Sequence, residues 1–151
     1  ISGTGTISLT YALAKTFAGG GVSLSSVTVD QGGAGNLTIS GSNSLKNITN
    51  SYSATGATTI TFTSGTTTTL TNFTAAGTSG KILTIGATST SAATLSKSSG
   101  TVSVDYVSIS YSTATGGASW NAGANSTNGG NNSGWIFSSA STSTSNFLMF
   151  F

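Results

Sequence analysis

The side chains that could act as acids, bases or ligands are few in this 151-residue chain. It has no His, Cys, Arg or Glu. Its ionisable side chains are four lysines and two aspartates, namely Lys15, Lys46, Lys81, Lys97, Asp30 and Asp105. A catalytic triad that uses His as its base cannot be built from these residues. Thiol chemistry and cysteine-based metal sites are excluded as well.

The two carboxylates are the one pair that could support acid–base catalysis. Glycoside hydrolysis uses two carboxyl groups about 5 to 10 Å apart. In the stacked coils that the repeat predicts, Asp30 and Asp105 lie about three coils apart, roughly 14 Å at the usual strand spacing. Two carboxylates are also too few for a dedicated calcium site. We therefore expect a protein without enzymatic activity, metal or cofactor.

Aromatic and amide side chains near the C-terminus could bind a sugar. Trp120 and Trp135 enclose a Gly- and Asn-rich segment that contains Asn121 and Asn125. Aromatic anchors beside adaptable amides are typical of recognition loops. These four residues are candidates for contact with a host surface glycan or receptor. The alternative is that both Trp rings cover the open end of a solenoid, because such an end needs a cap.

The composition points to an assembly of proteins. Charged residues make up 4% of the chain and the net charge is +2, whereas charged residues are about 25% of an average globular protein. A chain without Arg lacks the basic surface that nucleic-acid binding requires. Solubility usually depends on charge, so we expect the chain to be held among protein partners. No apolar run approaches the roughly 18 residues of a membrane-spanning helix, so no membrane span is expected.

The elements that position these residues are predicted to be β-strands. Ser, Thr, Gly and Asn dominate the chain, and they are mediocre or poor in helix interiors. The β-branched residues are abundant and favour strands. Ile7, Leu9 and Tyr11 alternate with hydroxyl-bearing residues, which is the period-two pattern of a half-buried strand. The predicted fold class is all-β.

An internal repeat of about 23 to 25 residues narrows the architecture. Each unit opens with two large apolar residues two positions apart: Leu37 with Ile39, Ile60 with Phe62, and Leu83 with Ile85. Repeats of this length mark solenoids, whose coils stack along one axis. The sequence therefore predicts a parallel β-solenoid, or β-helix, of about three to five short coils. An antiparallel β-sandwich has the same alternation and is the alternative.

The pattern divides the chain into four parts. They are an N-terminal β-strand region (1–36), the repetitive solenoid (37–112), a Trp-, Gly- and Asn-rich capping loop (113–137), and a linker with an apolar assembly tail (138–151). Asn47 and Asn72 occupy equivalent places in two repeat units. Their side chains either stack in a ladder or simply tolerate a turn.

Three motifs in the segment Leu95–Phe137 carry a family resemblance: SKxSGTVSVDYVSIS, ATGGAxWxAGANS and NxGWIF. Together they resemble a segment of predicted virion structural and tail-associated proteins of tailed bacteriophages, including marine and cyanobacterial phages. Over Ile1–Ala93 the likeness is only one of composition. The resemblance implies a β-rich fibre, spike or decoration module that is often oligomeric. It implies no substrate and no catalytic residue.

The expected function is therefore structural. We expect a virion component of a tailed phage, used as a tail fibre, spike or capsid decoration module. It would form a homo-oligomer, with a trimer favoured, beside other virion proteins. The alternative is a bacterial cell-surface adhesin or a self-assembling extracellular filament subunit, whose sheet edges would join by strand addition.

The apolar tail provides a first test of assembly. Its residues are Phe147, Leu148, Met149, Phe150 and Phe151. On a monomer they would form an exposed apolar patch, and such patches mark interfaces. Deleting these five residues is expected to lower the mass of the assembly measured by light scattering. An unchanged mass with unchanged solubility would mean that the tail makes no contact between subunits.

Overall fold

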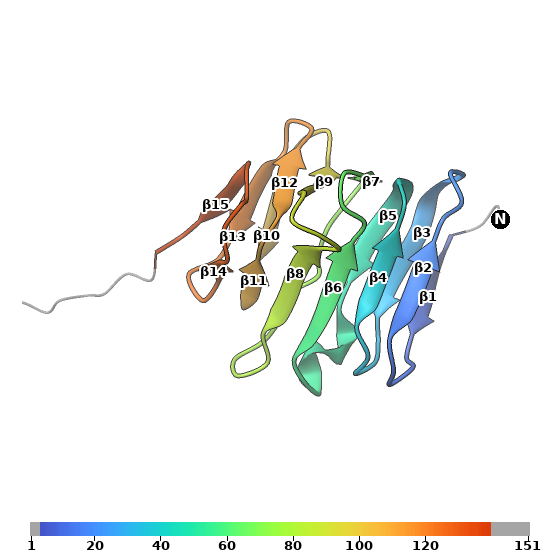
Figure 1. The fold of residues 1–151 in the computed structure, drawn as a ribbon, viewed down its shortest axis with the longest axis horizontal. Coiled ribbons are helices and arrows are strands. Elements are labelled where there is room, and N and C mark those ends of the chain that lie inside the picture. The colour runs from blue at the N-terminus through green and yellow to red at the C-terminus, as the bar shows by residue number, and fades with distance from the viewer. Residues whose placement is uncertain (1–3, 140–151) are drawn as a thin grey trace, which may run out of the picture.

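The computed structural model describes residues 4–139, which fold almost entirely into β-strands (Figure 1). In this range the single helical element is the short 3-10 helix η1 (Ser51–Ala54). The predicted all-β class is confirmed. No helix in the described range is long and apolar enough to cross a membrane. The tail Phe147–Phe151, for which an assembly role is predicted, lies outside the described residues.

The strands form three sheets, which we call A, B and C. Sheet A contains, in spatial order, β1 (Gly5–Leu9), β3 (Ser23–Gln31), β5 (Asn43–Thr49), β7 (Thr67–Leu70), β9 (Ala93–Ser96) and β12 (Ser112–Thr115). Sheet B contains β2 (Lys15–Ala18), β4 (Leu37–Ser40), β6 (Thr58–Phe62), β8 (Leu83–Ala87), β11 (Val107–Ile109) and β14 (Thr127–Asn128). Sheet C contains β10 (Thr101–Val104), β13 (Ser119–Ala122) and β15 (Trp135–Phe137).

The chain winds between the sheets, so that each turn lays its strands beside those of the turn before. Every pairing between these strands is parallel. The early coils pass from sheet A to sheet B, and the later ones pass through sheet C between the two. Figure 1 shows the coils stacked from the N-terminal to the C-terminal end. The fold is a parallel β-solenoid, as predicted, and not the antiparallel sandwich.

The solenoid has more coils than the repeat indicates. Sheets A and B each hold six strands, whereas the sequence predicts three to five coils. The extra coils come from residues 5–31 and 112–137, which pair in register with the central ones. The two end segments, predicted from composition to be a separate strand region and a capping loop, therefore belong to the same stack of coils. Their apolar residues do not follow the spacing of the repeat, because β12 is STAT and the pairing of the long strand β3 with β5 shifts register between Leu24 and Thr28.

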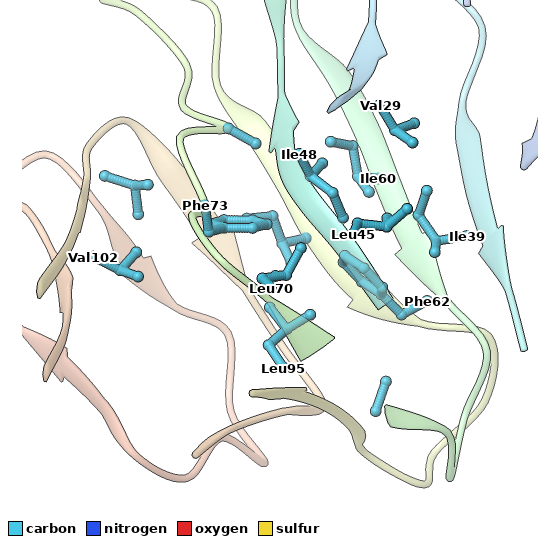
Figure 2. Packing of buried hydrophobic residues seen from close by; sticks show 14 of the residues in the cluster. Val29, Ile39, Leu45, Ile48, Ile60, Phe62, Leu70, Phe73, Leu95 and Val102 are labelled. Atoms are coloured by element: carbon cyan, nitrogen blue, oxygen red, sulfur yellow. The ribbon is translucent and has the colours of Figure 1, made fainter. Parts of the chain in front are cut away.

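Inward-facing aliphatic residues stack over one another through the coils. Leu37 pairs with Ile60, Ile60 with Ile85, and Ile85 with Ile109. All four are fully buried. Figure 2 shows Ile60 among the other core side chains that converge between the sheets. Burying a side chain of this size contributes about 1.5–3 kcal/mol, so this ladder is the main source of stability in a chain with few charges.

One pairing differs from the alignment that the repeat predicts. The pattern places Leu83 beside Ile60, but Leu83 lies beside Thr58 and Ile85 takes the position beside Ile60. The shift is two residues, and a shift of two leaves the same side chains pointing inward. Spacing alone could not fix this register, because either alignment gives a mainly apolar interior.

The first coil rests on the second through close backbone contacts at one corner. A Cβ atom on Gly35 would lie 1.7 Å from the carbonyl oxygen of Leu13, so only glycine allows this approach. Lys15 fastens the same corner, because its Nζ donates hydrogen bonds to the carbonyl oxygens of Gly33 (3.3 Å) and Gly35. Burial lowers the pKa of Lys15 from its ordinary value.

The Asn ladder that sequence reasoning considered is not formed. Asn47 and Asn72 do lie in neighbouring coils, as the hydrogen bond from the Asn72 N–H to the carbonyl oxygen of Lys46 indicates. Their side chains bond elsewhere, however. The Asn47 amide donates to the hydroxyl of Thr74 (2.8 Å). The Asn72 side-chain oxygen accepts from the N–H of Phe73 (3.0 Å).

The aliphatic ladder makes a quantitative prediction about stability. Ile60→Ala removes buried volume between two stacked neighbours and should lower the free energy of unfolding by about 2–5 kcal/mol. Thr61→Ala, on the outward face of the same strand, is the matched control and should cost about 1 kcal/mol or less. Denaturant unfolding measures both variants. Equal losses would mean that the ladder is not the main source of stability.

Candidate functional site

The four residues predicted to contact a glycan lie at the C-terminal end of the stack, on and beside β13 and β15 (Figure 1). Trp120 on β13 pairs with Trp135 on β15. Side chains alternate along β13, so Trp120 and Ala122 point inward while Ser119 and Asn121 point outward. The Trp120 indole and the Asn121 amide therefore lie on opposite faces of β13.

The two indole rings and Phe73 form an aromatic cluster inside the solenoid. The Trp120 and Trp135 ring centroids are 5.1 Å apart at 67°, the edge-to-face arrangement that aromatic pairs prefer. Phe73 lies 6.0 Å from Trp120 and 6.3 Å from Trp135. Each indole N–H is satisfied within the chain, by the carbonyl oxygen of Thr115 (3.1 Å) and by the hydroxyl of Ser112 (3.0 Å).

This packing agrees with the alternative that the rings cover the end of the core. Trp120 is 1% exposed, so it has no face open to a sugar ring. The interpretation of its indole as a glycan contact does not hold, because the ring fills the interior of the last coils. Trp135 is half-buried against the same cluster.

The two asparagines do not complete a recognition surface with the indoles. Asn125 is bound to Asp105, which accepts hydrogen bonds from its backbone N–H (3.0 Å) and its side-chain amide (2.8 Å). The Asn121 side-chain oxygen accepts a bond from the hydroxyl of Ser119 (3.3 Å). The amides thus contribute to local structure, and the structure does not bring the four candidates together as one binding site.

Asp105 organises the turn between β10 and β11. Besides Asn125, its carboxylate accepts bonds from the Tyr106 N–H (2.8 Å) and the Ser126 hydroxyl (3.3 Å). Tyr106 adopts a left-handed backbone conformation with φ of 54°, which the carboxylate stabilises. Burial alone would raise the pKa of Asp105, but the bonds from Asn125, Tyr106 and Ser126 outweigh it and hold the pKa below its ordinary value.

Asp30 fastens three successive coils. Its carboxylate accepts hydrogen bonds from the hydroxyl of Ser8 on β1 (2.7 Å) and from the hydroxyl (2.7 Å) and N–H (2.9 Å) of Ser51 after β5. Asp30 on β3 and Asp105 after β10 therefore sit on different coils, and each is engaged by its own neighbours. Within residues 4–139, no group of three or more His, Cys, Asp or Glu occurs that could hold a metal ion.

Sequence reasoning missed a hollowed region on the outer side of sheet A. Two adjoining hollows of about 360 and 290 Å³ lie there, and Ser44 and Thr69 line both. Outward hydroxyls occur on nearly every strand, so the pattern of alternation cannot single these out. Which hydroxyls line a hollow depends on the neighbouring turns, among them Lys97–Ser99, and the sequence does not reveal how those turns project.

Comparisons with protein-family models, with curated proteins and with solved structures found no match.

The bonds of Asp105 predict a pH dependence of stability. A carboxylate with a lowered pKa stabilises the fold above its unfolded pKa of about 3.9, and this contribution is lost as the pH falls through the folded-state pKa. Asp105→Asn should therefore melt at a lower temperature than the wild type at pH 7. The two melting temperatures should converge below about pH 3.9. A constant difference from pH 7 to acid would contradict this role of the charge.

Proposed function

We propose that this chain is a structural module of a tailed-phage virion, used as a tail fibre, spike or capsid decoration. It acts as a stiff stack of coils that joins other copies or other virion proteins. The resemblance of Leu95–Phe137 to phage structural proteins supports the virion setting. The observation that carries the proposal is the continuous stack of coils, whose strands pair in register from β1 to β12 and from β2 to β14.

The first coil in residues 4–139 carries exposed apolar side chains. β1 and β2 are the outermost strands of their sheets and each pairs on one side only. Ile7 lies above the buried Val29 and is 36% exposed, while Tyr11 and Leu13 are 64% and 65% exposed. Unpaired strand edges accept further strands. Exposed apolar patches mark contact surfaces, so the apolar residues of this coil are suited to pack against a further β-coil.

The unpaired edge formed by β1 and β2 also lacks the features that usually prevent edge strands from associating. Exposed edges are usually protected by charged residues or proline. From Thr4 to Ala18 the single charged residue is Lys15. Its ammonium group donates to the carbonyl oxygens of Tyr11 and Gly33, so it is held at the corner and does not guard the edge. An uncharged edge of this kind suits strand addition by another uncharged coil.

A second function shares the same edge. In a bacterial adhesin or extracellular filament, copies would add head to tail and the contact would not close, which produces open filaments. The two functions differ in what a purified chain does. Discrete oligomers, such as trimers, in light scattering and negative-stain images support the virion module, as does the chain's presence in purified particles. Open-ended filaments favour the extracellular fibre.

A charge on the open edge should prevent association. Ile7→Lys places an ammonium group among unpaired strand groups, and is expected to shift the chain from oligomer to monomer in light scattering. Ile82→Lys is the matched control, because Ile82 has the same exposure of 36% but lies beside a central coil. It should leave the mass unchanged. If Ile7→Lys keeps the wild-type mass, the first coil is not the assembly surface.

A further inference from the structure

The two hollows on the outer side of sheet A join into one groove, which we call the sheet A furrow. Both are lined by Ser44 and Thr69. The first extends toward Val22 and Ser23, and the second toward the turn that contains Lys97. The lining comes from β3, β5, β7 and the turn after β9, so the furrow runs along the stack over four successive coils.

An unbroken file of hydroxyl groups lies along the furrow and beyond it. In register, Ser23 pairs with Ser44, Ser44 with Thr69, Thr69 with Ser96, and Ser96 with Thr115. Parallel strands place neighbouring members of such a file about 4.8 Å apart. The hydroxyls of Ser44 and Thr69 form no hydrogen bond with any residue in the described range, so their donors and acceptors remain available to a ligand.

The turn at residues 97–100 forms one end of the furrow, and the next coil holds it in place. β3 and β5 pass the corner of the coil as continuous strands, but β9 ends at Ser96 and residues 97–100 form a turn before β10. The next coil packs tightly on this turn. A Cβ atom on Gly116 would lie 2.5 Å from the carbonyl oxygen of Lys97, and Ala118 donates its N–H to that oxygen (3.1 Å). The wall is thus held by its backbone.

The furrow carries positive charge without a neighbouring carboxylate. Lys97 lines its second part, with its ammonium group 2.7 Å from the carbonyl oxygen of Ser99. Lys46 is exposed and is the next outward residue after Ser44 on β5. The two carboxylates of the chain, on Asp30 and Asp105, are bound by other coils and line neither hollow. An anionic ligand in the furrow therefore meets one lining cation, Lys97, with a second, Lys46, exposed further along β5, and no opposing charge.

We infer that the sheet A furrow binds an anionic polysaccharide, a chain of sugars that carries carboxylate or sulfate groups. A pyranose ring is close to one strand spacing in length, so a polysaccharide lying along the stack would place about one sugar on each coil. The hydroxyls of Ser44 and Thr69 bond sugar hydroxyls, and Lys46 and Lys97 pair with the acidic groups. This inference goes beyond the structural role and does not depend on it, because it concerns only the outer surface of sheet A.

Affinity electrophoresis tests the inference with polygalacturonate as the anionic probe and dextran as the neutral one. The wild type should be retarded by polygalacturonate and much less by dextran. Lys46→Gln combined with Lys97→Gln should weaken binding about tenfold or more, because charge-assisted bonds are lost. Ser44→Ala combined with Thr69→Val removes the hydroxyls while keeping the shape, and should weaken it by a smaller factor.

Matched control variants distinguish binding at the furrow from nonspecific electrostatic attraction to the whole surface. Lys81→Gln removes one cation away from the furrow, and Thr61→Val with Thr84→Val removes two outward hydroxyls from sheet B. Both should retain wild-type binding, and melting temperatures confirm that each variant is folded. The inference is overturned if the wild type binds polygalacturonate no better than dextran. It is also overturned if the controls weaken binding as much as the furrow variants, or if single-stranded DNA binds equally well.

Discussion

Parallel hydrogen bonding between successive coils is the constraint on which the rest of this structure depends. Because each strand pairs in register with the strand before it, an inward side chain lies over an inward one and an outward side chain over an outward one. Inside, this produces the ladder from Leu37 to Ile109. Outside, it produces files of hydroxyls. It also accounts for the scarcity of charge, since like charges repeated on neighbouring strands would repel one another.

The sequence predicts the fold class and architecture because alternation and repeat length are properties of single strands and single coils. It does not predict register where two alignments both bury apolar residues, as with Leu83 and Ile85. It also leaves the role of Trp120 open, because an aromatic residue in a Gly-rich segment suits either a core or a binding loop. The strand parity of β13 decides this, and that parity appears only once β13 is paired with β10. Predicting the furrow also requires the path of the turns, which the sequence does not reveal.

The few ionisable groups serve mainly to hold coils together. Asp30 bonds residues of the coils on either side of it, and Asp105 ties its turn to the turn of the next coil. Lys15 binds carbonyl oxygens of the neighbouring coil. Hydrogen bonds to charged groups contribute about twice as much stabilising free energy as neutral ones. A small number of them can therefore fix the conformation of turns that lie outside the hydrogen-bonded strands. Lys97 differs in lining one of the hollows on sheet A, and Lys46 is exposed on β5 of the same sheet.

The aromatic cluster has an optical consequence. The chain has two Trp residues, and both lie in one cluster at the C-terminal end, with ring centroids 5.1 Å apart. Indole emission therefore comes from a single place, and rings this close can couple in near-ultraviolet circular dichroism. The N-terminal coils contain no indole and are silent in this signal. If the N-terminal coils unfold before the C-terminal ones, the emission wavelength stays constant until the last coils separate, so comparing it with a backbone signal reveals the direction of unfolding.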